Sequence, residues 1–315
     1  MDVSIIIVNY NTISLLANAV DSVFEKTDGL EYEIIVVDNN SSDNSKKILA
    51  EKYGDRVIFI GLSENIGFGR ANNEGAKIAT GRNLFFLNPD TILLNNAVKI
   101  LSDYLDSNPC VGCCGGNLFD ADGNPAISYG RVFLLDVFEK INALFLQLPE
   151  KFLYAKNKMF NYTNKPLKVA FICGADLMIQ KNLFNILKGF DSDFFMYYEE
   201  AELEYRASKA GYKIISVPYA KIIHLEGKSL SNNYERLNKY FVSQKVFMEK
   251  TCNPKTYIIY YYLFLQTIIY LFVFIILQKK SQINFWLEAY RLFIYKNKDS
   301  IIVIINEYFK MFLRR

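Results

Sequence analysis

The sequence predicts an α/β fold built around a mostly parallel central sheet. Within residues 1–90, short stretches rich in Ile, Val and Phe alternate with stretches of helical pattern. Continuous apolar strands that alternate with helices are typical of a parallel sheet covered by helices on both faces. A chain of 315 residues is long enough for one large core of this kind with an appendage.

The expected elements follow one another in a regular order. The first four strands are Val3–Val8, Glu33–Asp38, Val57–Ile60 and Asn83–Leu87. The helices between them are Ile13–Lys26, Asp43–Lys52 and Gly69–Thr80, and Asp43 has a residue type that commonly caps a helix. A helix over Asn95–Ser107 and strands over Val111–Phe119, Lys168–Ile179 and Tyr212–Val217 follow, with a further helix that ends at Gly211. Residues 126–165 have no clear pattern and are a candidate for ligand recognition.

An acidic helix start stands directly after an aromatic segment. Phe190 and Phe194–Tyr198 supply aromatic and apolar bulk, and Glu199, Glu200 and Glu202 follow in the first helical turn. A carboxylate against an aromatic wall loses hydration, so its pKa rises toward the range of a general base. Acidic residues in a first turn also complement the helix macrodipole, by roughly 0.3–1 kcal/mol each. This segment alone leaves both interpretations open.

Other chemically active residues follow the ends of predicted strands. Asp38 ends one strand, and Asp90 comes just after another, where Pro89 prevents the strand from continuing. Open α/β sheets bind ligands beyond the carboxyl ends of their strands. His224 is the only histidine of the chain. A lone histidine is more often structural than a ligand, but together with two such carboxylates and the acidic helix it indicates an active site.

Seven motifs in a fixed order carry a family resemblance. They are Val3–Asn11, Val36–Asp43, Glu64–Gly75, Leu87–Thr91, Cys173–Asp176, Phe195–Glu200 and His224. In this order and spacing, the chain resembles the family 2 glycosyltransferases, and among them the rhamnosyltransferase-like enzymes that extend bacterial surface polysaccharides. The resemblance implies a catalytic domain over residues 1–235 with the GT-A fold, the fold of nucleotide-diphospho-sugar transferases.

The resemblance also implies a metal-dependent reaction. A divalent cation, Mn2+ or Mg2+, neutralises a diphosphate leaving group with few protein ligands, because phosphates and water supply the rest. Asp90 and His224 are the metal ligands that the resemblance implies. Asn88 stands where many relatives in the wider superfamily carry a first Asp. We therefore expect weak metal binding in the absence of nucleotide.

The remaining residues of the donor site follow from the same resemblance. Asp38 matches the residue that hydrogen-bonds the nucleotide base, and Asn9 and Tyr10 lie nearby at the end of the first strand. Arg70 and Asn73 are candidates for contacts with the diphosphate or the ribose.

Glu200 matches the position of the general base, where aspartate is usual. The extra methylene moves the carboxylate by about one bond length, and positioning effects in catalysis are large. Glu199 or Glu202 could share the role of base. Asp176 matches an acceptor-side loop and is expected to touch the sugar. The expected reaction is a single displacement with inversion at the anomeric carbon.

The donor implied by the resemblance is a dTDP- or UDP-sugar, with rhamnose as one of several compatible sugars. A non-catalytic saccharide- or nucleotide-binding protein that retains the fold is the alternative from a different class. The presence of Asp38, Asp90, Glu200 and His224 argues against it, since a binding protein need not keep a metal site and a base together.

Residues 236–315 form a second region with its own composition. They contain 13 Lys and Arg against 4 Asp and Glu, whereas the rest of the chain has 23 against 29. A basic tail that is also apolar indicates an anionic membrane surface as partner, and no nucleic acid. Tyr257–Leu277 is long enough to span a bilayer, but a span would export basic residues against the positive-inside tendency.

We therefore expect a helical tail that lies in the inner leaflet at the cytoplasmic face of the membrane. A re-entrant segment or a true span remains an alternative. A membrane-associated tail also predicts a lipid-linked oligosaccharide as the acceptor.

Overall fold

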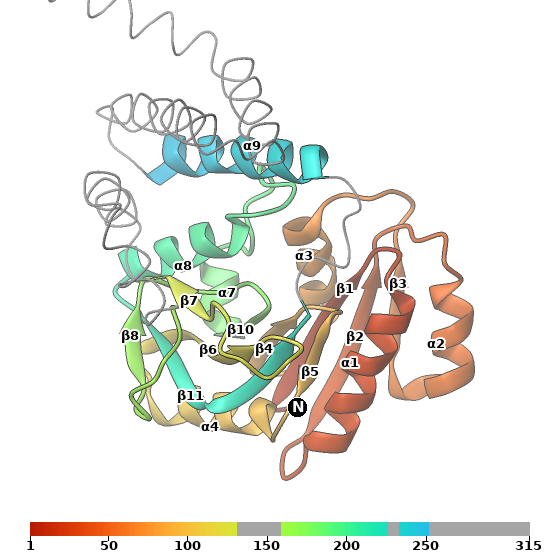
Figure 1. Cartoon of the computed structure of the whole chain (residues 1–315), viewed down its shortest axis with the longest axis horizontal. Helices are drawn as coiled ribbons and strands as arrows, with labels where there is room; N and C mark the ends of the chain where they lie inside the picture. The colour runs from red at the N-terminus through yellow and green to blue at the C-terminus, as the bar shows by residue number, and fades with distance from the viewer. Residues whose placement is uncertain (131–158, 226–232, 252–315) are drawn as a thin grey trace, which may run out of the picture. The chain divides into compact units, whose positions relative to one another are not determined.

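Residues 1–130, 159–225 and 233–251 are described by the structure, a computed structural model (Figure 1). The chain divides into two compact units, Met1–Ser231 and Asn232–Arg315. The tail segment Tyr257–Leu277 and residues 131–158 of the patternless region lie outside the described residues. The predicted boundary at residue 235 and the predicted role of the tail therefore stay predictions.

Parallel strands form the amino-terminal half of the main sheet. They are β1 (Val3–Asn9), β2 (Tyr32–Asp38), β3 (Ile58–Gly61) and β4 (Asn83–Leu87), paired in the order β3-β2-β1-β4. The connecting helices are α1 (Ile13–Lys26), α2 (Ser45–Tyr53), the short η1 (Gly54–Arg56) and α3 (Phe68–Ile78). The four predicted strands are confirmed to within one residue at each end.

The start of α2 differs from the prediction. Its N-cap is Asn44, in the left-handed region at φ 58°, and not Asp43. The carboxylate of Asp43 instead accepts hydrogen bonds from Ile13 N at 2.9 Å and from Ser45 N at 3.3 Å. Asp43 therefore ties the start of α2 to the start of α1.

The other half of the main sheet is mixed. β10 (Asp176–Gln180) runs antiparallel to β4 and to β6 (Val111–Phe119), and β11 (Lys213–His224) runs parallel to β6. Two three-residue strands, β5 (Thr91–Leu93) and β8 (Leu167–Val169), pair antiparallel with β11. The helices here are α4 (Ala97–Ser107), α7 (Lys181–Ile186) and α8 (Glu199–Lys209). The parallel character thus holds for β3-β2-β1-β4, and the α/β fold class is confirmed.

The strand predicted over Lys168–Ile179 is wrong as one element. It is divided into β8, β9 (Phe171–Ile172) and β10. β9 leaves the main sheet to pair with β7 (Tyr129–Gly130), and Cys173–Ala175 form the connection into β10. An apolar run gives the strand period but does not show which sheet each part joins.

Two layers of helices enclose the sheet, and side-chain alternation along the strands serves both (Figure 1). Ile5 and Ile7 of β1 pack into the cluster that contains residues of α1, α2 and α4. Ile6 and Val8 pack into the opposite cluster, with residues of α3, α7 and α8. Successive strand residues point to opposite faces, so an unbroken apolar strand is buried on both sides.

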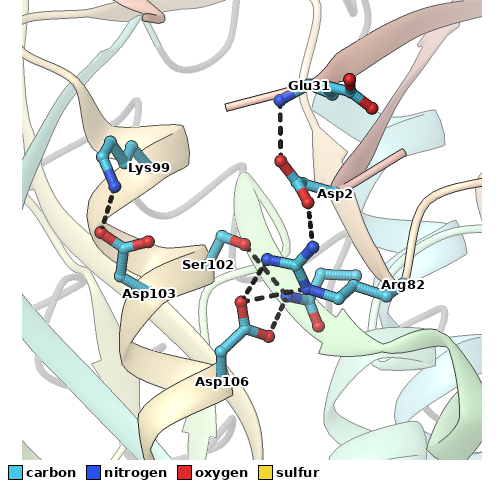
Figure 2. A network of polar contacts seen from close by, with 8 residues as sticks. Asp2, Glu31, Arg82, Lys99, Ser102, Asp103 and Asp106 are labelled. Atoms are coloured by element: carbon cyan, nitrogen blue, oxygen red, sulfur yellow. Dashed lines mark hydrogen bonds and ion pairs between the residues drawn. The ribbon is translucent and has the colours of Figure 1, made fainter. Parts of the chain in front are cut away.

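A charged network ties together the amino-terminal ends of β1 and β4 (Figure 2). Arg82 pairs with Asp2 and, at 2.6 Å, with Asp106 of α4, while Glu31 N donates to the carboxylate of Asp2 at 2.8 Å. These contacts hold the pKa values of Asp2 and Asp106 below their ordinary range, through hydrogen bonds from Glu31 N and Arg82 to Asp2 and from Arg82 to Asp106. The network lies where β1 and β4 begin, whereas the predicted site lies where the parallel strands end.

The second unit is described through one helix, α9 (Asn233–Thr251). None of the described helices combines the length and the apolar character needed to cross a membrane.

Candidate active site

Neighbouring parallel strands place predicted site residues together at their carboxyl ends. β1 ends at Asn9, β2 at Asp38 and β4 at Leu87, and these strands run parallel side by side. Asp90 follows β4 and precedes β5. The predicted position of Asp38 and Asp90 at the carboxyl ends of strands is confirmed, and these ends are where open α/β sheets bind ligands.

Asn9 and Asp38 contact each other directly. Asn9 Nδ2 donates to Asp38 Oδ1 at 2.7 Å and to Ser45 Oγ at 2.7 Å, and Ser41 N donates to Asp38 Oδ2 at 2.9 Å. Asn9 is fully buried, whereas Asp38 keeps 7% of its surface and Tyr10, beside them, keeps 42%. Asn9 therefore orients the Asp38 carboxylate, and the side chain of Tyr10 is the exposed member of this group.

Asp90 and His224 are brought together by the pairing of β5 with β11. His224 lies opposite Thr91 in this ladder, and Leu225 N donates to the carbonyl of Asp90 at 2.9 Å. Asp90 Oδ1 then lies 3.4 Å from His224 Nε2, and Asn88 Nδ2 lies 3.4 Å from the same nitrogen. The sequence predicts this pair through the resemblance, but not the short strand that forms it.

The pair fits a divalent cation. A carboxylate oxygen and an imidazole nitrogen are donors that such ions accept. Asn88 Oδ1 is buried and has no hydrogen-bond partner among the described residues, so an oxygen is present beside the pair. Within residues 1–130, 159–225 and 233–251, no group of three or more His, Cys, Asp and Glu side chains gathers as a metal site. Two such side chains suit an ion whose other ligands come from a bound diphosphate and water.

Two neighbouring carboxyl groups begin α8. Glu199 is 4% exposed, and its Oε2 has no hydrogen-bond partner in the described part of the chain. Glu200 is partly exposed. Burial, followed by the nearby Glu200 carboxyl, raises the pKa of Glu199 well above its ordinary value, and burial raises the pKa of Glu200 as well. The desolvated carboxyl expected from the aromatic segment is therefore present at both positions.

The other acidic residues of α8 already have hydrogen-bonding partners within the protein. Glu202 accepts from Arg206, one turn later, with a closest N–O distance of 2.6 Å. The i,i+4 spacing of this pair is visible in the sequence. Glu204 is fully buried, and its two carboxyl oxygens lie 2.9 and 3.1 Å from Ile172 N. These partners favour Glu200, and not Glu202, as the carboxylate that meets a substrate.

Asp176 lies at the start of β10 and is fully buried. Its carboxyl accepts a hydrogen bond from Gly116 N at 2.5 Å, and burial raises its pKa well above the ordinary value. In this structure Asp176 joins β10 to β6, so the sugar contact expected from its motif stays a prediction that would require its exposure.

Arg70 and Asn73 of α3 contact the segment before α8. Arg70 Nε donates to Ser192 O at 2.8 Å. Asn73 Nδ2 donates to Phe190 O at 2.8 Å, and Asn73 Oδ1 accepts from Phe190 N at 2.9 Å. Their predicted contacts with diphosphate or ribose are untested, but the polar atoms of Asn73 already have backbone partners.

The connection between β9 and β10 contacts both Asn88, which lies beside the metal-ligand candidates, and Glu200. Asn88 N donates to Ala175 O at 3.0 Å. A Cβ atom built on Gly174 would lie 3.2 Å from the Glu200 carboxyl carbon, so this carboxyl packs directly on the Gly174 backbone. Gly174 belongs to the Cys173–Asp176 motif, but the motif does not predict this contact. The signal in the sequence is the residue type itself, because a glycine leaves room for the Glu200 carboxyl.

Comparisons with known proteins identify the class that this fold and site define. The family model described as glycosyl transferase family 2 matches residues 4–184, which are more than half of the chain. Solved structures share the fold at 18% sequence identity. GalNAc-T7 in complex with UDP, GalNAc and Mn2+ matches with a TM-score of 0.53, over 76% of this chain and 47% of that one. S. aureus TarS 1–349 in complex with UDP matches with a TM-score of 0.51, over 76% and 64%.

The chain therefore belongs to glycosyl transferase family 2. Among its relatives, the O-antigen chain rhamnosyltransferase WbaN of Salmonella anatum is 27% identical over 80% of this chain and 73% of that protein. An N-acetylglucosaminyl-diphospho-decaprenol L-rhamnosyltransferase of Mycobacterium tuberculosis is 22% identical over 62% of this chain and 67% of that one. The O-antigen biosynthesis protein RfbC of Myxococcus xanthus is 26% identical over 72% of this chain, which spans 17% of RfbC. The predicted family and GT-A fold are confirmed.

Proposed function

We propose that this chain transfers a sugar from a dTDP- or UDP-sugar to a saccharide acceptor, with inversion at the anomeric carbon, in bacterial surface-polysaccharide synthesis. The carrying observation is the Glu200 carboxyl. It is partly exposed, burial raises its pKa, and it packs on the Gly174 backbone. The next residue, Ala175, accepts a hydrogen bond from Asn88 N, and the Asn88 side chain lies beside His224 of the Asp90–His224 pair. The names of the relatives, which include rhamnosyltransferases of O-antigen and of a decaprenol-linked acceptor, support rhamnose as the sugar and a lipid-linked oligosaccharide as the acceptor.

In the proposed mechanism each residue has a separate task. Asp38, oriented by Asn9, accepts a hydrogen bond from the nucleotide base, and the exposed side chain of Tyr10 contributes a further contact with the nucleotide. Asp90 and His224 hold a divalent cation, Mn2+ or Mg2+, which supplies positive charge for the diphosphate leaving group when it is bound. Glu200 accepts the proton of the acceptor hydroxyl as that oxygen attacks the anomeric carbon.

Glu200→Gln tests the proposed base. The variant keeps the size of the side chain and one accepting oxygen, but replaces the other oxygen with an NH2 group and cannot take a proton. We expect turnover to fall by about 10²- to 10⁴-fold, with nucleotide affinity changed less than about twofold. Transfer is measured with dTDP-rhamnose and UDP-sugars on a lipid-linked acceptor, and nucleotide binding by calorimetry.

The pH profile gives a second measurement on the wild type. The base acts only when it is deprotonated, so kcat/KM falls as pH drops through the pKa of Glu200. Since burial raises this pKa, the acidic limb should lie above that of an ordinary glutamate. The matched control for Glu200→Gln is Glu25→Gln, at an exposed position, which should keep both the turnover and the pH profile of the wild type. Full turnover in Glu200→Gln would exclude Glu200 as the base, and nucleotide binding without any transfer in the wild type would favour a non-catalytic binding protein.

A further inference from the structure

The first turns of α3 form hydrogen bonds with the backbone of the segment that leads into α8. Phe68 N, at the start of α3, donates to Phe195 O at 2.8 Å. Arg70 and Asn73 add side-chain bonds to the backbone of Ser192 and Phe190. Three positions of α3 thus hold three backbone positions within residues 190–195, which we call the clamped segment.

The approach of α3 to this segment depends on the absence of side chains. Gly67 has a φ of 90°, and a Cβ atom there would lie 2.4 Å from Phe195 O. Gly189 has a φ of 74°, and its Cβ atom would lie 2.5 Å from Asn73 Oδ1. A Cβ atom on Gly69 would lie 3.1 Å from Phe190 Cβ and 3.4 Å from Glu199 Cβ. Glycine at these three positions therefore lets α3 and this part of the chain approach closely, to the Phe195 backbone at Gly67 and to side-chain atoms at Gly69 and Gly189, and this restricts the position of the clamped segment.

The chain makes an unusual turn between the clamped segment and Glu200. Tyr197 and Tyr198 have φ values of 72° and 66°, the left-handed region that bulky residues rarely adopt. Such a conformation persists only where surrounding contacts determine it, and it concentrates at functional sites. The hydrogen bonds from α3 lie before this turn, and the packing of Glu200 on Gly174 lies after it.

We propose that Arg70 and Asn73 are positioning residues for the general base. They hold the clamped segment against α3, and the left-handed turn at Tyr197–Tyr198 then directs the Glu200 carboxyl onto the Gly174 backbone. This inference rests on the proposed role of Glu200. It differs from the expectation that these side chains bind the diphosphate or the ribose, because their bonds run to backbone atoms of the clamped segment.

Two conservative variants test the proposal. Arg70→Lys keeps the positive charge that a diphosphate would need but loses the planar donor pair that reaches the Ser192 carbonyl. Asn73→Asp keeps the acceptor for Phe190 N and replaces the donor to Phe190 O with a second oxygen. Lys77→Gln, at an exposed position on the same helix, is the matched control.

Each variant is measured by kcat, by the Kd of UDP and dTDP with Mn2+, and by amide hydrogen exchange of peptides within residues 190–200. We expect kcat to fall by about 10- to 100-fold, the nucleotide Kd to change less than about twofold, and exchange to accelerate in those peptides only. The acidic limb of the kcat/KM profile should move to lower pH, since a displaced Glu200 is better hydrated.

The opposite pattern overturns the proposal. A nucleotide Kd weakened by tenfold or more, with unchanged exchange in residues 190–200, would assign Arg70 and Asn73 to the donor site. Unchanged kcat and unchanged exchange in both variants would also exclude positioning. A wrong assignment of the base can be told apart from a wrong assignment of the positioning residues. If Glu200 is not the base, Glu200→Gln retains turnover, and this result does not depend on the hydrogen exchange of the clamped segment.

Discussion

Asp90 meets His224 only because the three residues of β5 pair with the last residues of β11. The carboxylate and the imidazole are 8% and 10% exposed, so few water molecules reach them from the protein surface. A site with two such side chains and a buried amide oxygen has too few protein donors to hold an ion firmly alone. We infer that metal and nucleotide bind together.

Asp90→Asn tests this joint binding. For the wild type, Mn2+ and the correct nucleotide together should stabilise the fold by about 2.7 kcal/mol at a hundred times the dissociation constant. Each alone should give a smaller shift. In Asp90→Asn the metal-dependent part of this stabilisation should disappear, because an amide oxygen carries no negative charge to offset the charge of the ion. Melting curves of the apo and ligand-bound protein give the measurement.

Asp103→Asn is the control, because Asp103 pairs with Lys99 at an exposed position of α4. A metal-dependent shift of equal size in Asp90→Asn and in the wild type would remove Asp90 from the metal site. His224→Asn should weaken the same shift if the imidazole is a ligand.

At the scale of elements, α8 is a helix that buries carboxyl groups. Glu199 and Glu204 are buried, and burial, together with nearby carboxyl groups, raises the pKa of both well above the ordinary range. Glu204 connects α8 to β9 through Ile172 N, two residues before the glycine against which Glu200 packs. A buried carboxyl that stays protonated can accept this bond without placing a full charge in the core.

Glu204→Gln tests the protonation state. In the unfolded chain Glu204 loses its proton above about pH 4.3, whereas burial keeps the proton in the folded state. The folded state then binds more protons, so the free energy of unfolding falls as pH rises, by up to about 1.4 kcal/mol per pH unit. Glutamine cannot ionise and can still accept from Ile172 N. We expect a shallower pH dependence in the variant and higher stability at neutral pH.

Urea unfolding of both proteins at acidic, intermediate and mildly alkaline pH measures these slopes. Glu51→Gln, at an exposed position of α2, should leave the slope unchanged. Parallel slopes for Glu204→Gln and the wild type would show that Glu204 is ionised in the folded protein.

The elements differ in how far the sequence predicts them. β1, β2, β3 and β4 are continuous apolar runs buried on both faces, so their period and composition identify them. β5 has three residues, too few for a pattern, and its pairing with β11 is a long-range contact. The sequence does not predict the turn at Tyr197–Tyr198 either. Its left-handed backbone depends on the contacts around it, and tyrosine as a residue type disfavours that conformation.

Candidate site residues follow the same rule. Asp38, Asp90 and the α8 carboxyls were predictable from their places at strand and helix ends. The burial of Asp176, the bonds of Arg70 and Asn73 to backbone atoms, and the contact of Glu200 with Gly174 depend on how separate elements pack. Motif resemblance gives the position of such residues, but only tertiary contacts show which atoms are already engaged.

At the scale of the whole molecule, charge is divided along the chain. The 13 Lys and Arg of residues 236–315 stand against 4 Asp and Glu, while the rest of the chain has an acidic excess. An enzyme that extends a lipid-linked acceptor gains from residence at the membrane, and basic residues near anionic lipid contribute about 1 kcal/mol each. We propose that residues 236–315 hold the protein at an anionic membrane surface.

Flotation of the full chain with lipid vesicles tests this proposal. Binding should be stronger to vesicles that contain phosphatidylglycerol than to pure phosphatidylcholine, and it should weaken in high salt as charges are screened. Replacing Lys279 and Lys280 together with glutamine should reduce partitioning by about 30-fold, which corresponds to about 2 kcal/mol. The matched control replaces Lys46 and Lys47, exposed residues of α2, and should leave partitioning unchanged. Equal flotation of both double variants would remove Lys279 and Lys280 from the membrane contact, and a chain that stays off anionic vesicles at low salt would contradict the membrane assignment itself.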